Sequence, residues 1–197
     1  MNNVSSIIKN IPNMKAIFIR HSKTVFEKDT PPVNWVLSEE GVKLAKDFAK
    51  KEAFSSLDVI YSSLQNKALE TAVILAKPNR IPIDTCHELT EVTSITNGII
   101  PDYEETVRKF HEGELENINN GETIQQALDR FSKALKRISS KFPNGTVGIV
   151  SHANILSIYL SRFCSYNSYQ LHKKIQMPDY AIMDYSKKKL TKLFQAL

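Results

Sequence analysis

Cysteine and long apolar runs are scarce in this 197-residue chain, and each scarcity excludes a class of protein. The two cysteines, Cys86 and Cys164, lie far apart without metal-type spacing, which excludes a disulfide framework and fits a reducing compartment. No stretch approaches the roughly 20 apolar residues that span a bilayer, so we expect no membrane association. Residues 1–13 also lack the apolar core of a signal peptide, which makes the cytoplasm the expected location.

Nucleic-acid and nucleotide signatures are missing as well. The chain is basic, with a net charge of +5, but its lysine clusters at 173–174 and 187–189 are predicted to be a solvated loop and a solvated strand edge. No aromatic residues alternate with these cations, so we expect no nucleic-acid partner. Neither common nucleotide-cradling glycine loop is present. The mild positive charge would instead help to attract anionic substrates.

The organisation of the chain suits one compact domain. Hydrophobic residues make up 42% and charged residues 24%, which is ordinary for a globular protein. We expect a lead-in over residues 1–14 and a single domain over residues 15–197. The stretch 92–120 is less regular and forms a predicted insert, and such inserts often cover a binding site.

Apolar runs and amphipathic segments alternate along the chain. They predict helices after Ser38 and after Ser63 and over 104–111, 122–141 and 153–163. They predict strands over 16–19, 57–61, 81–85, 146–150 and 181–185, with an edge strand over 189–194. This alternation predicts an α/β fold, a three-layer α/β/α sandwich with a mostly parallel central sheet.

Two of the predicted strands end in the same way. The run 16–19 is followed by Arg20 and His21, and the run 147–150 is followed by Ser151 and His152. In open α/β sheets, ligands bind just beyond the carboxyl ends of the strands. A cation and two titratable imidazoles therefore stand where such folds carry out their chemistry.

Together with these two strand ends, further short motifs follow one another along the chain. They are Arg20-His21, Leu37-Ser38-Glu39-Glu40-Gly41, Ser62-Ser63 with a later cation and Thr71-Ala72, Leu89-Thr90-Glu91, Gly121-Glu122-Thr123, and Ser151-His152. In this order the chain resembles the histidine phosphatase superfamily, also called phosphoglycerate mutase-like proteins. The resemblance covers about residues 15–185 and is specific because the whole ordered set is present.

The resemblance implies three catalytic roles. His21 would be the nucleophile that accepts the phosphoryl group, since a neutral imidazole is a competent nucleophile near pH 7. His152 would stabilise the charge that spreads over the phosphoryl oxygens. Glu91 would protonate the leaving oxygen and then activate water, although Glu88 lies close by in the sequence. The scheme requires no metal and no other cofactor.

The remaining candidates would bind the substrate phosphate. Arg20 would clamp two phosphoryl oxygens with its planar guanidinium, and Lys67 occupies the position where the family has a second arginine. Thr24 either donates its hydroxyl to the phosphate or is an ordinary loop threonine. Ala153 begins a predicted helix, whose first backbone amides favour an anion.

Several other polar residues have more than one interpretation. Ser62 either lines the pocket or caps the following helix, and capping is favoured. His87, His111 and His172 share no metal-type spacing and are predicted to be structural or solvated.

The departures from the family pattern leave alternatives open. Ser22 and Ala153 stand where the family usually has glycine, which matters only if the backbone φ is positive there. We predict a phosphatase that hydrolyses a small phosphate monoester through a phosphohistidine on His21. The alternatives are a phosphate-binding or regulatory module with weak catalysis, favoured by these replacements and by Lys67, and a phosphoglycerate-type mutase. The short insert favours hydrolysis over mutase chemistry.

Overall fold

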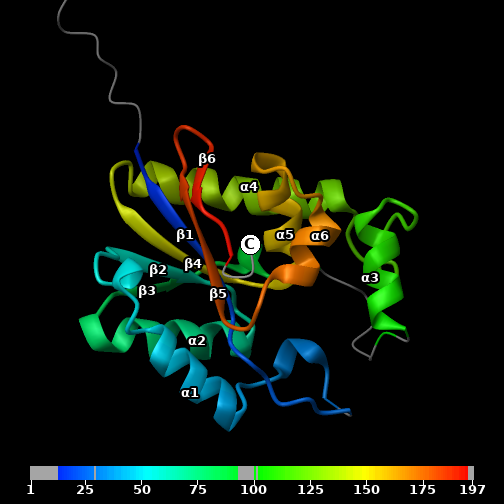
Figure 1. Ribbon diagram of the computed structural model, residues 1–197, viewed down its shortest axis with the longest axis horizontal. Coiled ribbons are helices and arrows are strands. Elements are labelled where there is room, and N and C mark those ends of the chain that lie inside the picture. The colour runs from blue at the N-terminus through cyan, green and yellow to red at the C-terminus, as the bar shows by residue number, and fades with distance from the viewer. Residues whose placement is uncertain (1–12, 29, 93–99, 101, 195–197) are drawn as a thin grey trace, which may run out of the picture.

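The central sheet contains six strands within the part of the chain that the structure describes. This structure is a computed structural model that describes residues 13–28, 30–92, 100 and 102–194. The sheet order is β3-β2-β4-β1-β5-β6 (Figure 1), in which β1 to β4 run parallel and β5 and β6 antiparallel to their neighbours. The strands are β1 (Lys15–Arg20), β2 (Val59–Ser62), β3 (Ile83–Thr85), β4 (Thr146–Ser151), β5 (Asp179–Asp184) and β6 (Lys189–Lys192).

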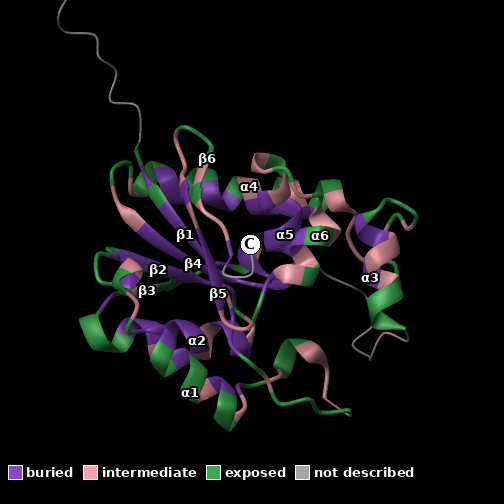
Figure 2. Cartoon of the chain, viewed as in Figure 1, coloured by how far each residue is buried: buried purple, intermediate pink, exposed green. Residues whose placement is uncertain are grey.

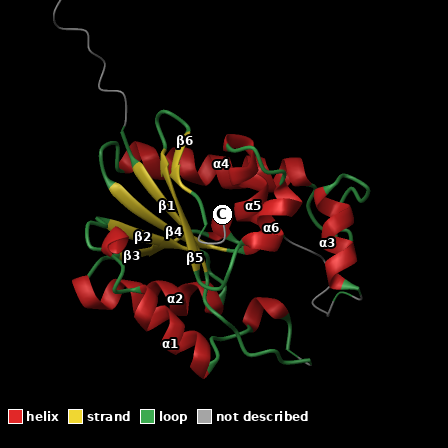
Figure 3. Ribbon diagram, viewed as in Figure 1, coloured by secondary structure: helices red, strands yellow, loops and turns green. Residues whose placement is uncertain are grey.

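Helices cover both faces of the sheet. Helices α1 and α2 lie on one face, and α4, α5 and α6 lie on the other (Figures 1 and 3). Their bounds, with α3, are α1 (Glu39–Phe48), α2 (Asn66–Ala76), α3 (Tyr103–His111), α4 (Ile124–Lys141), α5 (Ala153–Leu160) and α6 (Ser168–Lys174). Single-turn 3₁₀ helices lie at Pro32–Asn34, Glu52–Phe54, Lys77–Asn79, His87–Leu89 and Ser161–Phe163. The arrangement confirms the predicted three-layer sandwich.

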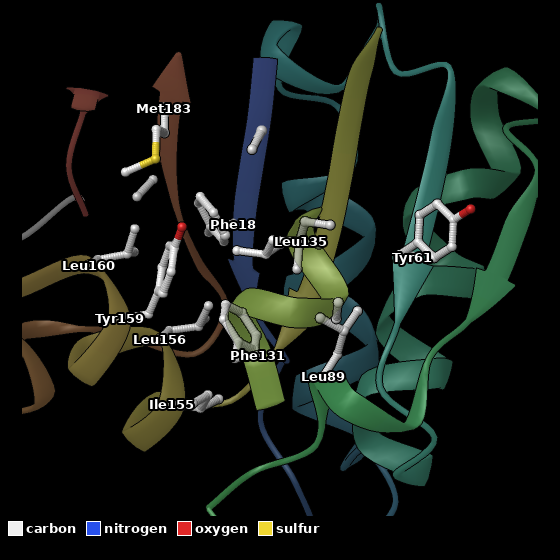
Figure 4. Close-up of a cluster of buried hydrophobic side chains, with 14 of the residues drawn as sticks. Phe18, Tyr61, Leu89, Phe131, Leu135, Ile155, Leu156, Tyr159, Leu160 and Met183 are labelled. Carbon is white, nitrogen blue, oxygen red and sulfur yellow. The ribbon is translucent and has the colours of Figure 1, made fainter. Parts of the chain in front are cut away.

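Strand β1 is buried on both faces, which explains its uninterrupted apolar run. Because successive side chains of a strand alternate between faces, Phe18 packs on the α4 and α5 side while Ile17 and Ile19 pack on the α1 and α2 side. Figure 2 shows β1, β2, β4 and β5 as the buried centre of the molecule, while the edge strands β3 and β6 are more exposed. In Figure 4 the Phe18 ring lies among Phe131 of α4 and Tyr159 of α5, with ring centroids 6.4 and 5.6 Å from it.

Helix α6 was not predicted from the sequence. Lys173 and Lys174 lie in its last turn and not in a loop, so this part of the prediction is wrong. Asn167 caps the helix and accepts a hydrogen bond from the Gln170 amide, while the Gln170 side chain bonds back to the Asn167 amide. This reciprocal capping box is visible in the sequence and could have located the helix.

Some expectations concern residues outside the described ranges. Most of the predicted lead-in, residues 1–14, and part of the predicted insert, residues 92–120, fall there. Within the described residues, no helix is both long enough and apolar enough to cross a membrane.

Candidate active site

The parallel strands β1 and β4 bring the two predicted histidines together. Arg20 lies opposite Ser151 in the register, and the His21 amide donates to the Ser151 carbonyl over 3.1 Å. His21 and His152 therefore leave adjacent strands at the same edge, and their ring centroids lie 5.2 Å apart. Both side chains are buried, and the pair is the centre of a candidate site.

His21 has the hydrogen bonding of a neutral nucleophile. Its Nδ1 lies 2.7 Å from the Ser22 carbonyl oxygen, which can only accept, so Nδ1 carries the proton and Nε2 keeps its lone pair. Burial lowers the pKa of His21 to about 3, and the charges of Lys67 and Arg20 act in the same direction. The imidazole is therefore unprotonated at Nε2 at neutral pH.

The backbone after His21 is fixed from two helices. The Ser22 amide donates to Thr71 Oγ1 of α2 over 3.0 Å, and the Ser22 hydroxyl donates to the Gly41 carbonyl of α1 over 2.7 Å. Gly41 is required here because a Cβ on it would lie 1.9 Å from the Lys23 carbonyl oxygen. Neither Ser22 nor Ala153 has a positive φ, so the loss of glycine at these positions introduces no backbone strain.

Two cations lie close to His21, and the structure gives each a backbone partner. Arg20 Nη1 donates to the Ile175 carbonyl over 2.5 Å, while its Nε has no hydrogen-bond partner among the described residues. Lys67 is buried, and its Nζ donates to the Pro32 carbonyl over 2.8 Å and lies 5.7 Å from the centroid of the Trp35 ring. Burial lowers the pKa of both cations, and the charge of Glu91 opposes this shift.

Glu91 occupies the amino end of helix α5. Its carboxylate accepts the backbone amides of Asn154 at 3.1 Å, Ile155 at 3.0 Å and Val92 at 2.9 Å. Ala153 is the first residue of α5, where the sequence predicted that backbone amides would bind an anion. In this structure the Asn154 and Ile155 amides bind the Glu91 side chain. These contacts hold the carboxylate at the start of α5, the helix whose N-cap is His152.

Arg130 is the main residue that sequence reasoning missed. From α4 it donates to the carbonyls of Glu88 at 2.7 Å, Thr90 at 3.1 Å and Glu91 at 3.3 Å. It also forms a two-point ion pair with Glu122, and both side chains are largely buried. Its place three residues after buried Ala127, at the border of the apolar face of α4, was the available signal.

Thr24 and Ser62 make contacts other than the predicted ones, and Ser62 is fully buried at the end of β2. The Thr24 backbone forms an isolated antiparallel bridge with Leu37, which joins the loop after His21 to the chain entering α1. The Ser62 hydroxyl donates to the Ser63 carbonyl, and the cap position of α2 is Gln65. The prediction that Ser62 caps α2 is therefore wrong, because the helix begins three residues later than that role requires.

A histidine pair and a cavity lie beside Arg20, between α3 and α6. The His111 and His172 rings have centroids 5.2 Å apart, and His111 Nε2 lies 3.0 Å from Asn154 Oδ1. A cavity of about 270 Å³ is lined by Arg20, Tyr103 and His172, among others. Over the described ranges, no three His, Cys, Asp or Glu side chains are grouped to hold a metal ion. The cavity is polar and adjoins the Arg20 cation.

The partly buried His172, whose Nδ1 is shielded from solvent, predicts a loss of stability in acid. Burial lowers its pKa to about 3, and nearby His111 and Arg20 contribute. The unfolded chain binds a proton at this position below about pH 6.5, whereas the folded chain stays neutral until about pH 3, so stability is lost as the pH falls between these values. We expect this residue to account for about 2 kcal/mol of lost unfolding free energy between about pH 7 and pH 5. Urea unfolding of the wild type and His172→Gln at both pH values measures it, and equal pH dependence in the two proteins would contradict it.

Comparison with known proteins relates this arrangement to one family and to a curated relative. The family model described as histidine phosphatase superfamily (branch 1) matches residues 16–192. The curated protein phosphoserine phosphatase 1 of Hydrogenobacter thermophilus is 26% identical over 175 residues, which cover 78% of this chain and 81% of that protein.

Solved structures share the fold. The phosphoserine phosphatase of Entamoeba histolytica in complex with 3-phosphoglyceric acid aligns with a TM-score of 0.73 at 21% identity, covering 93% of this chain and 99% of that chain. The phosphoglycerate mutase of Bacillus anthracis aligns with a TM-score of 0.68 at 14% identity, covering 95% of each chain. At these identities the similarity concerns the α/β architecture, and it agrees with the fold predicted from the sequence.

Proposed function

The chain belongs to the histidine phosphatase superfamily and is a phosphatase of that family, and from this premise we propose that His21 carries a phosphohistidine intermediate. The observation that supports this most is the bond from His21 Nδ1 to the Ser22 carbonyl, because it leaves the lone pair on Nε2. A buried neutral imidazole with a fixed free nitrogen is suited to attack phosphorus.

The first step transfers the phosphoryl group to the enzyme. His21 Nε2 attacks phosphorus, a nitrogen–phosphorus bond forms, and the bond between phosphorus and the ester oxygen breaks. Glu91 in its protonated form gives its proton to the departing oxygen, so the product leaves as an alcohol. Arg20, Lys67 and His152 face the charge on the phosphoryl oxygens, which is the main requirement of phosphoryl transfer.

The second step releases phosphate. Water attacks phosphorus, Glu91 accepts the proton from that water, and the nitrogen–phosphorus bond breaks to restore neutral His21. The three backbone amides that hold the Glu91 carboxylate keep it in one place through both steps.

The substrate is proposed to be a small phosphate ester. The cavity of about 270 Å³ beside Arg20 is available for the part of the ester that leaves, and its polar lining favours a polar leaving group. Because one curated relative is a phosphoserine phosphatase, phosphoserine is the first ester to assay.

A phosphate-binding module with weak catalysis is the second candidate. The observation that favours it is the position of Lys67, whose Nζ already bonds the Pro32 carbonyl and would have to leave that bond to reach a phosphate. Lysine also lacks the two-point grip that arginine gives phosphate.

Trapping of the phosphoenzyme separates the two candidates. The protein is mixed with ³²P-labelled phosphoserine or an aryl phosphate and quenched in alkali within one turnover. The expected product is a label that is stable in alkali, lost in acid and located on His21, because phosphohistidine is acid-labile. His87→Ala, a change at an exposed histidine, is the matched control and should label normally. Turnover or binding without any label on His21 would overturn the proposal.

A further inference from the structure

His152 shares a buried hydrogen bond with a serine that is assigned no role so far. His152 Nε2 lies 2.8 Å from Ser63 Oγ, and both residues have no solvent-exposed surface. The other ring nitrogen, Nδ1, is buried and has no hydrogen-bond partner within the described part of the chain. Nδ1 is therefore the nitrogen of His152 that remains for a ligand.

The contacts of Ser63 set the direction of this bond. Ser63 Oγ accepts the Gln65 backbone amide, with N and Oγ 3.2 Å apart. The amide occupies one of the two acceptor positions of the hydroxyl, and among the described residues the only acceptor available for the hydroxyl proton is His152 Nε2. Donation to Nε2 therefore satisfies the hydroxyl, whereas a second accepted bond would leave its buried proton without a partner there.

The charge state of His152 restricts the choice further. Burial, reinforced by His21 and Lys67, holds the pKa of His152 well below its ordinary value near 6.5. The ring is neutral at pH 7 and carries a single proton. A proton on Nε2 would leave a lone pair on Nδ1, which repels an anionic oxygen, whereas a proton on Nδ1 makes that nitrogen a donor.

We propose that Ser63 is a positioning residue that donates to His152 Nε2 and thereby holds the proton on Nδ1, which donates it in a hydrogen bond to an oxygen of the bound phosphoryl group. This inference rests on the proposed function, because it gives His152 its donor role in phosphoryl transfer. It explains how a neutral histidine stabilises negative charge without first becoming protonated.

The fold makes Ser63 a rigid support. Its amide donates to the Val150 carbonyl over 3.0 Å, so its backbone is tied to β4 just before His152. Ser62 is paired with Val150 in the register of β2 and β4. Serine and imidazole therefore leave neighbouring strands, and movement of one relative to the other would break strand pairing.

Nitrogen NMR of the full chain tests the tautomer directly. In protein labelled with ¹⁵N-histidine, the expected spectrum shows His152 Nδ1 protonated and Nε2 unprotonated, and inorganic phosphate should shift the Nδ1 signal. In Ser63→Ala the two tautomers should become mixed. A proton on Nε2 in the wild type, or an unchanged tautomer in Ser63→Ala, would overturn the proposal.

Kinetics supply the second readout. Ser63→Ala is expected to lower kcat by about 10- to 100-fold, the scale found when the hydrogen-bond partner that orients a metal-binding imidazole is removed. Ser63→Thr keeps the hydroxyl and should retain most of the activity and the wild-type tautomer, which also covers the case in which the alanine variant does not fold. Ser55→Ala, at an exposed serine, is the control. Equal activity of Ser63→Ala and wild type contradicts the positioning role.

The two readouts keep this inference separate from the proposed function. The nitrogen signals are recorded without turnover, and inorganic phosphate is the probe. If no phosphohistidine forms on His21, the proposed function fails while the tautomer and its response to phosphate still decide the role of Ser63.

Discussion

His21→Ala is expected to lower kcat by at least about 10³-fold, the scale seen when a covalent nucleophile is removed. The alanine variant leaves no nitrogen within the site at the position of Nε2, and the neighbouring His152 uses Nε2 to contact Ser63. Steady-state hydrolysis of an aryl phosphate measures the loss, which corresponds to about 4 kcal/mol of transition-state stabilisation.

Two controls make this result specific. His21→Gln retains a side chain of similar length, so equal loss in both variants attributes the effect to the nucleophile and not to a cavity. His87→Ala changes an exposed histidine and should keep wild-type activity. If a preparation of His21→Ala free of other phosphatases still hydrolysed the aryl phosphate substantially, the phosphohistidine mechanism would be excluded.

Arg130→Met is expected to lower the free energy of unfolding by about 3 kcal/mol and to reduce kcat as well. The stability effect follows because the change removes one member of a largely buried ion pair and leaves the other charge behind. The kinetic effect follows because the carbonyls of Glu88, Thr90 and Glu91 lose the guanidinium that gathers them. Urea unfolding measures the first effect and kcat for the aryl phosphate measures the second.

Lys133→Met is the matched control for Arg130. It removes an exposed cation from the same helix, three residues further along, and should change the free energy of unfolding by less than about 0.5 kcal/mol. Wild-type stability in Arg130→Met would show that the Glu88–Glu91 segment holds its shape without this side chain. Unchanged kcat would show that the position of Glu91 does not depend on it.

The sequence predicted much of the fold because its signals were local. Ser38 caps α1 as expected and Pro78 follows the end of α2, so chemistry within one turn decided both boundaries. The amphipathic pattern placed α4 within two residues of its observed start. Helix α6 was missed because it is short and its apolar side rests on one buried residue, Leu171, so periodicity alone gave no clear signal.

Some residues of the candidate site could also be predicted from local sequence, whereas the contacts of others depend on the tertiary structure. Arg20, His21 and His152 could be found because they lie at strand ends: Arg20 is the last residue of β1, and His21 and His152 directly follow β1 and β4. The partners Ser63 and Arg130 could not be assigned their contacts, since these join residues 89 and 42 positions apart in the chain. Such contacts depend on which strands and helices become neighbours, and residue type alone does not fix that.

The sequence by itself determined the strand ends, because local hydrophobicity distinguishes strands from helices. It also determined the order of the motifs, and that order indicates the family. Only the tertiary structure decided that β1 and β4 are neighbours, that the first amides of α5 hold Glu91, and that Lys67 bonds the Pro32 carbonyl. The reason is that a buried polar group must find a partner, and which partner it finds is set by the packing of distant segments. The tertiary structure likewise decides which ring nitrogen of His152 carries the proton, because Ser63 reaches Nε2 from a neighbouring strand.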